Sequence, residues 1–395
     1  MQPADIDALM SPAGRALLAE LTTYDDTAAL AVGERLRRQG LAPALVAAAM
    51  TQARLRARAV AKLGPDAERM LFTADGLEQA TRREVADRRA ARLVAAGARR
   101  VADLGCGIGA DALAFARAGL EVRAVERDPA TAAVARANVR SAGLAHLVEV
   151  VEADVTQVGL AGCDAAYLDP ARRGEGRRRY DPQQWSPPWE FVLGVAGQIP
   201  RTAAKVAPGI DHALVPPGAE AEWVSVDGDV VEAGVWFGPL AGSWPRRAAL
   251  LPSGATVAGP AVPPPAAAAP GPYLYEPDGA VIRAGLVAEA AAEVDGWLVD
   301  PTIAYVSAGR HVPTALMTAY LVHETAPFSQ RRVVQMLRAR GAGDVVVKKR
   351  GTAVVPEQLR ARVLPALPER GRGPAVTVVL TRVLGKHTAL VVERL

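Results

Sequence analysis

The segment DLGCGIGAD, residues 103–111, decides the fold prediction. It follows the short apolar run RVADL (100–104) and precedes a stretch with helical spacing of apolar residues, so it joins a strand to a helix. Gly105, Gly107 and Gly109 allow a tight turn whose backbone N–H groups can approach a ligand without a side-chain clash. A strand, a glycine-rich turn and a helix in this order predict the ligand-binding edge of an open α/β sheet.

Further short apolar runs alternate with amphipathic segments along residues 99–251. This alternation predicts a mostly parallel sheet with helices on both faces. In residues 221–238, two alternating runs flank Asp227-Gly228, the pair favoured in a two-residue hairpin turn, which predicts an antiparallel hairpin at the sheet edge. The other predicted strands are RVADL (100–104), LEVRAVE (120–126), LVEVVEA (147–153), DAAYLD (164–169) and DHALVPP (211–217).

The flanking segments have different patterns. Residues 1–98 show helical spacing without alternating strands, which predicts a helical N-terminal domain. Residues 252–272 are rich in proline, glycine and alanine and predict a semi-rigid linker without a packed element. Residues 273–395 mix strand and helix patterns, so we expect an α+β domain of ordinary size there. The arginines of the last N-terminal helix favour a solvated helix face over a binding surface; they are Arg82, Arg83, Arg88, Arg89 and Arg92.

The composition excludes several classes of protein. The chain has 395 residues, a net charge of +4, two cysteines and five histidines. Two cysteines, Cys106 and Cys163, form neither a disulfide framework nor a metal-binding motif, so we expect no metal and a reducing cytoplasm. The start of the chain lacks the pattern of a signal peptide, and no stretch has the roughly twenty apolar residues of a membrane span.

Two classes of cofactor fit the glycine turn. GCGIGA (105–110) satisfies the G-x-G-x-x-A pattern of dinucleotide folds, and Glu126 has the spacing at which such enzymes bind ribose hydroxyls, so an NAD-dependent oxidoreductase is one alternative. Asp103 favours S-adenosylmethionine, because a carboxylate suits an ammonium and a sulfonium but repels a pyrophosphate. Asp154, after the third strand, is placed to accept a hydrogen bond from an adenine amine. These charges favour S-adenosylmethionine.

The motifs resemble those of class I S-adenosylmethionine-dependent methyltransferases. CGIGADALAFA (106–116) and DPATAAVARAN (128–138) are similar in particular to the trimethylguanosine synthase branch. Residues 70–395 resemble a bacterial methyltransferase family that ends in a THUMP-like domain, with LDPAR (168–172), YEPDGAVIRAGL (275–286) and VLGKHTALVVERL (383–395) in corresponding places. This resemblance implies a Rossmann-like methyltransferase domain between the helical domain and an α+β THUMP-like domain.

The resemblance also implies which residues bind the cofactor. Asp103, Gly105, Gly107 and Gly109 would line the methionine end, Glu126 the ribose and Asp154 the adenine. For Asp111 both cofactor contact and capping of the next helix are open, since Asp is common near helix starts. Asp128 is expected to begin the helix at Pro129.

The Asp-Pro turn after the fourth strand is the predicted catalytic element. A carboxylate followed by proline can hold the N–H of an exocyclic amine while its nitrogen attacks a methyl group. Asp169 fits this role, Pro170 would fix the turn and Ala171 would leave room. Amino-methyltransferases of this type usually have an aromatic residue at the fourth position, where this chain has Arg172, which could stack on a base or bind a phosphate.

Several residues are candidates for substrate contact. The glycine-interrupted basic segment after the turn could grip phosphates or could be a solvated charge run. Aromatic side chains near it could contact a base or pack in the core. THUMP domains in other enzymes bind RNA, and basic residues in the tail domain fit phosphate contacts, although a dimerisation role is the alternative. The candidates are Arg173, Arg177, Arg178, Tyr180, Trp185, Trp189, Lys348 and Lys349.

We therefore predict an S-adenosylmethionine-dependent methyltransferase that acts on RNA, ribosomal or transfer RNA, at a base amine. Transfer would be direct, because neither cysteine lies in a motif for covalent catalysis. One alternative keeps the cofactor and changes the acceptor to a protein or small molecule. Another is a non-catalytic RNA-binding protein, which the presence of the loop glycines, Glu126 and Asp169 disfavours.

Overall fold

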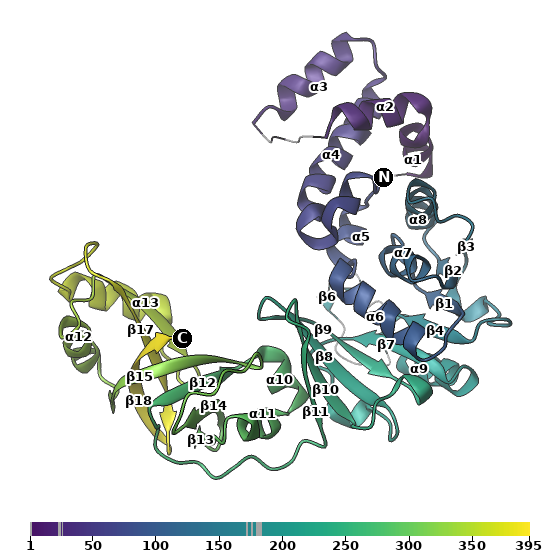
Figure 1. Cartoon of the computed structure of the whole chain (residues 1–395). Helices are drawn as coiled ribbons and strands as arrows, with labels where there is room; N and C mark the ends of the chain where they lie inside the picture. The colour runs from purple at the N-terminus through teal and green to yellow at the C-terminus, as the bar shows by residue number, and fades with distance from the viewer. Residues whose placement is uncertain (1, 23–24, 26, 171–172, 175–176, 179–183) are drawn as a thin grey trace. The chain divides into compact units, whose positions relative to one another are not determined.

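The computed structural model describes residues 2–22, 25, 27–170, 173–174, 177–178 and 184–395 (Figure 1). Residue contacts divide the chain into two units, each described by itself below. Unit 1 comprises Met1–Val206 and Gly234–Gly242, and unit 2 comprises Ala207–Ala233 and Ser243–Leu395. The predicted domain boundaries near residues 98, 251 and 272 stay predictions.

Unit 1 begins with helices, as predicted (Figure 1). Proline occupies the first turn of α1, α2 and α4, where its missing N–H costs no hydrogen bond. Buried leucines and alanines of these helices share one apolar core with α7, α8 and the first strands of the sheet. The helices are α1 (Pro3–Met10), α2 (Pro12–Glu20), α3 (Ala29–Arg38), α4 (Pro43–Leu63), the 3₁₀ turn η1 (Gly64–Glu68), α5 (Ala74–Gln79) and α6 (Arg83–Ala95).

The sheet of unit 1 contains five parallel strands in the order β7-β4-β1-β2-β3. Helices α7 and α8 connect β1 to β2 and β2 to β3, and α9 connects β4 to β7 (Figure 1). All carboxyl ends therefore meet at one edge, where open α/β sheets place ligands. The bounds are β1 (Arg100–Leu104), α7 (Ala110–Arg117), β2 (Glu121–Glu126), α8 (Pro129–Ser141), β3 (Val148–Glu152), η2 (Val155–Gln157), β4 (Ala165–Leu168), α9 (Trp189–Gln198) and β7 (Arg201–Val206).

One predicted strand of this region is wrong. Residues 211–217 contain only the 3₁₀ turn η4 (His212–Leu214), and the strand beside β4 is β7, ten residues earlier. Two prolines in PP (216–217) remove backbone donors from the predicted strand. The strand β7 was not predicted, because the buried Lys205 interrupts its apolar pattern.

The Asp227-Gly228 hairpin is present. Both residues have positive φ, 52° and 89°, as a type I′ turn requires. The turn joins β8 (Glu220–Val226) to β9 (Asp229–Trp236). Two further strands, β10 (Arg246–Leu251) and β11 (Ala255–Gly259), form an antiparallel pair, and β10 lies parallel to β8. The whole sheet has the order β11-β10-β8-β9-β7-β4-β1-β2-β3, so β11 is an edge strand and lies inside the segment for which we predicted no packed element.

The tail region forms a second sheet, as the α+β prediction requires. Its seven strands have the order β13-β14-β12-β15-β18-β17-β16. Two short helices follow the first strand of this sheet and are separated at Gly285, which has a positive φ of 72°. The elements are β12 (Tyr273–Pro277), α10 (Gly279–Ala284), α11 (Val287–Glu293), β13 (Trp297–Asp300), β14 (Ile303–Ala308), β15 (Met317–Pro327), α12 (Gln330–Arg338), β16 (Asp344–Lys349), α13 (Pro356–Val363), η6 (Leu364–Ala366), β17 (Ala375–Val383) and β18 (Lys386–Arg394).

A buried asparagine joins the N-terminal segment to the glycine turn. Asn138 of α8 is 1% exposed and accepts a hydrogen bond from Leu71 N at 2.6 Å. Its amide donates to Leu71 O at 3.0 Å and to Ile108 O at 2.9 Å. One side chain thus holds the residues before α5 and the centre of the glycine turn in a fixed relation.

We predict that Asn138→Ala lowers the free energy of unfolding by about 1–3 kcal/mol, because a buried N–H and two buried carbonyl groups lose their partner. Urea denaturation measures this change. Arg140→Ala, an exposed position on the same helix, is the control and should change stability by less than about 0.5 kcal/mol. Equal stability of the two variants would contradict this role of Asn138.

Candidate active site

The glycine turn bends across the end of β2. Gly105 N and Cys106 N both donate to Val125 O, at 2.9 and 3.0 Å, and Gly107 N donates to Glu126 Oε2 at 3.1 Å. Gly105, Gly107 and Gly109 all have positive φ, 94°, 55° and 86°, a conformation that other residues rarely adopt. A Cβ atom on Gly107 would meet nothing within 4 Å, whereas one on Gly105 would lie 3.5 Å from Asp169 O. The turn therefore has open space at its centre and the Asp-Pro turn against its start.

Asp103, the last polar residue before this turn, is a buried carboxylate without a partner. It is 0% exposed, and among the described residues neither of its oxygens has a hydrogen-bond donor. Burial, followed by the negative charges of Asp111 and Asp169, raises the pKa of Asp103 well above its ordinary value. A buried carboxylate in this state fits a cationic ligand group, which would supply both the charge and the missing donors.

Asp111 lies in the first turn of α7 but does not cap this helix. The N-cap of α7 is Gly109, and the Asp111 carboxylate instead accepts from Thr81 Oγ1 at 2.7 Å and from Arg89 Nη1. Arg89 is 3% exposed, and its guanidinium lies 4.3 Å from the ring centre of Tyr167. The expectation of a solvated face is therefore wrong for Arg89, because this side chain is buried. The local sequence contained no sign of this, since its partner Asp111 lies 22 residues further along the chain.

Glu126 and Asp154 hold local turns at the ends of β2 and β3. The second Glu126 oxygen accepts from Asp128 N at 2.9 Å. Asp128 accepts from Thr131 Oγ1 at 2.6 Å and from Thr131 N at 2.8 Å, and these bonds lower its pKa. The bond from Thr131 N confirms Asp128 as the N-cap of α8. Asp154 Oδ1 accepts from Thr156 Oγ1 at 2.6 Å and Thr156 N at 2.9 Å, and these bonds lower the pKa of Asp154. Both acids lie at the same sheet edge.

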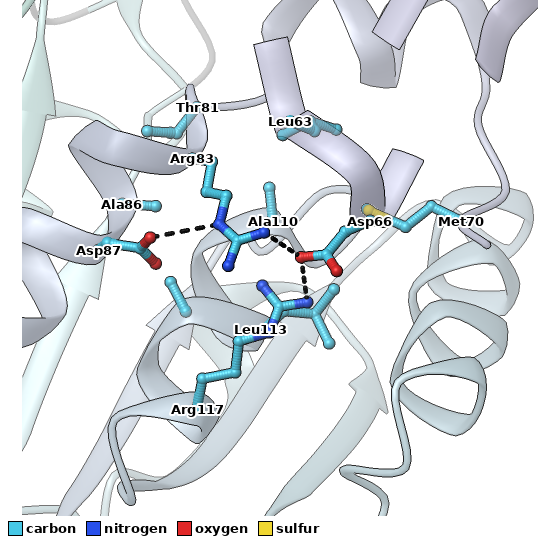
Figure 2. A pocket seen from close by; sticks show the side chains of 11 residues that line it. Leu63, Asp66, Met70, Thr81, Arg83, Ala86, Asp87, Ala110, Leu113 and Arg117 are labelled. Carbon is cyan, nitrogen blue, oxygen red and sulfur yellow. Dashed lines mark hydrogen bonds and ion pairs between the residues drawn. The ribbon is translucent and has the colours of Figure 1, made fainter. Parts of the chain in front are cut away.

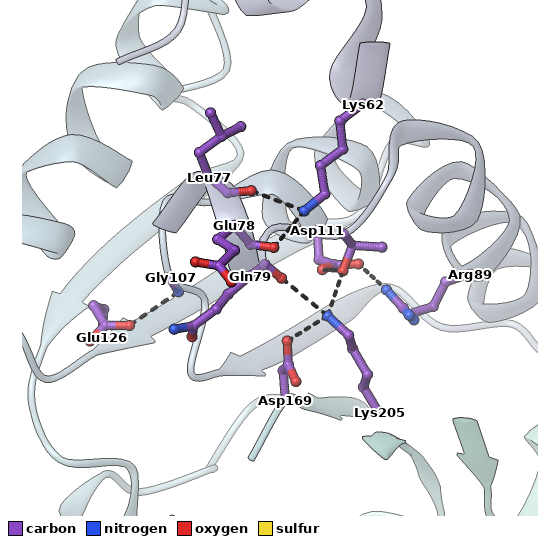
Figure 3. Close-up of polar contacts among 11 residues, drawn as sticks. Lys62, Leu77, Glu78, Gln79, Arg89, Gly107, Asp111, Glu126, Asp169 and Lys205 are labelled. Atoms are coloured by element: carbon purple, nitrogen blue, oxygen red, sulfur yellow. Dashed lines mark hydrogen bonds and ion pairs between the residues drawn. The ribbon is translucent and has the colours of Figure 1, made fainter. Parts of the chain in front are cut away.

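Asp169 forms an ion pair that the sequence analysis missed. Its Oδ2 accepts from Lys205 Nζ at 2.9 Å, and Lys205 is 8% exposed (Figure 3). Lys205 Nζ also lies 3.3 Å from Thr81 Oγ1 and 3.4 Å from Gln79 O. The only sequence signal was one lysine within the apolar run TAAKVA (202–207).

The N-terminal helices contribute to the same site. Lys62 of α4 donates to Leu77 O at 2.9 Å and Glu78 O at 2.8 Å, at the end of α5 (Figure 3). Burial, helped by the charge of Lys205, lowers the pKa of Lys62 to about 8. The segment from Leu77 to Thr81 thus carries contacts to Lys62, Lys205 and Asp111, and it forms one wall beside the Asp-Pro turn.

The structure describes some of the predicted catalytic and substrate residues and not others. Ala171, Arg172 and Tyr180 lie outside the described residues, and Pro170 is buried. The backbones of Arg173 and Arg177–Arg178 form a short antiparallel pair, β5 (Arg173–Gly174) with β6 (Arg177–Arg178).

The aromatic candidates lie in the core. Trp189 is 4% exposed and packs edge-on against Trp185, at 6.0 Å between ring centres, and 6.4 Å from Phe237. In unit 2, Lys348 pairs with Glu276 and lies over the Tyr320 ring, while Lys349 is exposed. The burial of Trp185 and Trp189 favours core packing over contact with a base. Lys349 remains accessible to a substrate.

A pocket beside α6 and α7 is filled by ion pairs of its own (Figure 2). Arg83 pairs with Asp66 at 2.9 Å and with Asp87 at 3.4 Å, and Arg117 pairs with Asp66 at 2.8 Å. Because these charges compensate each other, the pocket does not compete with the strand ends as a site for a charged cofactor.

Neither a metal site nor a membrane-spanning helix is present among the described residues. No group of three or more His, Cys, Asp or Glu side chains is arranged to hold a metal ion. Within the same residues, no helix has the length and apolar character needed to span a membrane.

Three segments of the chain match known domain families. Residues 101–168 match the methyltransferase domain family and residues 317–394 match the THUMP domain-like family, while residues 2–59 match a domain of unknown function. A solved structure from Porphyromonas gingivalis W83, described as a methyltransferase, aligns with a TM-score of 0.76 at 20% identity, over 94% of this chain and 99% of that one. The fold is therefore Rossmann-like in its catalytic part and THUMP-like at its end.

The family follows from a closer relative. An S-adenosylmethionine-dependent methyltransferase of Mycobacterium tuberculosis, present in strains CDC 1551 and H37Rv, is 37% identical over 346 residues, which cover 83% of this chain and 90% of the relative. The chain belongs to the S-adenosylmethionine-dependent methyltransferases, and S-adenosylmethionine is its cofactor. The NAD-dependent alternative is thereby excluded.

We predict that Asp103→Asn makes the cofactor-free protein more stable and cofactor binding weaker. Folding raises the pKa of Asp103, so the ionised group costs stability, and this cost grows as pH rises above the ordinary carboxyl value. Thermal unfolding should therefore show a gain for the variant that is larger at about pH 8 than at about pH 5.

Calorimetry should show that Asp103→Asn raises the Kd of S-adenosylhomocysteine at least about tenfold, since a charge-assisted hydrogen bond contributes about 1.5–3 kcal/mol. Asp7→Asn, at an exposed site of α1, is the control. Unchanged affinity, or a variant less stable than the wild type at both pH values, would refute the role given to Asp103.

Proposed function

We propose that this methyltransferase acts on RNA at a base amine by direct transfer from S-adenosylmethionine. The observation that carries the proposal is the contact between the two turns. Asp169 follows β4, and its backbone oxygen would lie 3.5 Å from a Cβ atom placed on Gly105. The Asp169 side chain is 26% exposed. A carboxylate acceptor is thus both adjacent to the cofactor turn and accessible to a substrate.

In this proposal the carboxylates at the strand ends bind the cofactor. Asp103 would receive its ammonium, Glu126 its ribose hydroxyls and Asp154 its adenine amine. The described carboxylates at or beside this edge include Asp103, Asp111, Glu126, Asp154 and Asp169, and the buried cations beside them include Arg89 and Lys205. An excess of negative charge suits a cofactor with two cationic groups and one carboxylate. Asp111 would act through Arg89 and Thr81 by fixing the wall of the site.

Direct transfer is supported by the state of both thiols. Cys106 is buried, which raises the pKa of its thiol well above the ordinary value, and burial also raises the pKa of Cys163. A covalent mechanism needs a thiolate, so neither cysteine is prepared for it. In the proposed step, the amine nitrogen bonds to the methyl carbon as the carbon–sulfur bond breaks. The cofactor leaves as S-adenosylhomocysteine, and the nitrogen then loses one proton through Asp169 to solvent.

RNA as the acceptor is supported by the THUMP-like domain and by exposed basic residues. Lys349 and Arg331 are exposed, and the segment after the Asp-Pro turn is rich in arginine. Phosphate contacts by such groups give affinity without sequence reading. One observation favours the second candidate, a protein or small-molecule acceptor: part of the tail charge is already compensated, since Glu324 pairs with Arg332 and Arg340.

We predict that Asp169→Ala lowers the rate of methyl transfer at least about a hundredfold, because the group aimed at the reacting amine is lost. The assay follows label from methyl-tritiated S-adenosylmethionine into total RNA of a strain that lacks the gene, with mass spectrometry of the nucleosides. Glu121→Ala, at the opposite end of β2, is the control and should keep full activity.

The Kd of S-adenosylhomocysteine should stay within about twofold of the wild type for both variants, since neither removes a group aimed at the cofactor. Unlabelled RNA with normal cofactor binding by the wild type would overturn the RNA proposal. Label that persists with Asp169→Ala would overturn the role of Asp169.

A further inference from the structure

The register of two neighbouring strands brings a second functional residue to the Asp-Pro turn. Strands β4 and β7 are parallel, and Leu168 pairs with Ala204 at the carboxyl end of the ladder. The next residues are Asp169, just past the end of β4, and Lys205, still within β7, so the two lie side by side. The two residues are 36 positions apart in the sequence, so their contact is evident only from the pairing of β4 with β7.

The Lys205 ammonium is held on three sides. Its acceptors include Asp169 Oδ2 at 2.9 Å, Thr81 Oγ1 at 3.3 Å and Gln79 O at 3.4 Å. An ammonium has three N–H donors, so each acceptor can receive one. Thr81 in turn donates to Asp111, which pairs with Arg89. Lys205 is thus anchored by a network that reaches the start of α7 and does not depend on the substrate.

Only one oxygen of Asp169 is used by this pair. Among the described residues, hydrogen bonds reach Oδ2 from Lys205 and none reaches Oδ1. The Asp169 side chain is 26% exposed, whereas that of Lys205 is 10% exposed. The lysine therefore holds the carboxylate from its buried side and leaves the accessible side to an incoming group.

We propose that Lys205 is a positioning residue for methyl transfer, which holds the Asp169 carboxylate by Oδ2 so that Oδ1 receives the acceptor N–H. This rests on the function proposed for Asp169 above. The same charge also selects the acceptor: an ammonium beside the carboxylate repels a protonated aliphatic amine and tolerates a neutral amine conjugated to a ring. Lys205 thereby favours base amines over lysine side chains.

A purely structural role predicts a different pattern. A buried ion pair adds little net stability, and an apolar side chain of similar volume often replaces it without loss. If Lys205 only filled space, Lys205→Met would fold and turn over normally. If it positions Asp169, the same variant folds and binds cofactor but transfers slowly, because the carboxylate is free to rotate.

The test compares Lys205→Met, Lys205→Arg and Arg201→Met. Arg201 lies at the other end of β7 and donates to Ala96 O, so its variant is a matched loss of one cation from the same strand. Each protein is given methyl-tritiated S-adenosylmethionine and extract of a strain lacking the gene, and label is counted separately in RNA, protein and small-molecule fractions. The Kd of S-adenosylhomocysteine and the thermal midpoint are measured for each.

We expect kcat of Lys205→Met to fall at least about tenfold with KM for the labelled fraction changed less than about threefold. Lys205→Arg, which keeps a cationic donor, should recover part of the loss, and Arg201→Met should keep wild-type kcat. Cofactor affinity should stay within about twofold throughout.

Three results would overturn the inference: normal kcat for Lys205→Met, loss of cofactor binding together with activity, or no label in any fraction with the wild type. Label in protein alone, with the kcat pattern kept, would instead refute the RNA proposal and the selection of ring amines while sustaining the positioning role.

Discussion

The parallel register of β1, β2, β4 and β7 is the constraint on which this site depends. It brings the carboxyl ends of four strands to one edge, and each end carries a charged residue: Asp103 before the glycine turn, Glu126, Asp169 and Lys205. Burying so many charges costs free energy unless each finds a partner. The described part of the chain supplies partners for Glu126 and Asp169 but none for Asp103. Asp103, whose burial without a donor lowers the stability of the cofactor-free protein, is therefore the group best suited to bind a cationic part of the cofactor.

The N-terminal helical region is part of this site. Its segment from Leu77 to Thr81 supplies acceptors for Lys62 and Lys205 and a donor for Asp111. Asn138 ties the residues just before that segment to the glycine turn. This segment therefore forms a wall of polar groups around Lys205 and Asp111, beside Asp169.

Prediction from sequence succeeded where the signal was local. The glycine turn, the N-cap at Asp128 and the Asp227-Gly228 hairpin depend on neighbours within a few residues, and each is present. Prediction failed where a partner lies far along the chain. Arg89 looked solvated because its partner Asp111 is on another helix, and Lys205 hid a strand because the apolar pattern breaks where the charge is paired. The edge strand β11 was missed because its pairing with β10 outweighs a weak local propensity.

The central claim is that the buried carboxylate of Asp103 is completed by the cofactor, and a crystal structure with S-adenosylhomocysteine tests it most directly. The account predicts that the cofactor ammonium lies within about 3.2 Å of an Asp103 oxygen. It also predicts that the ribose hydroxyls lie at Glu126 and that the sulfur faces Asp169. A cofactor bound elsewhere along the sheet edge, with Asp103 still lacking a donor, would contradict it.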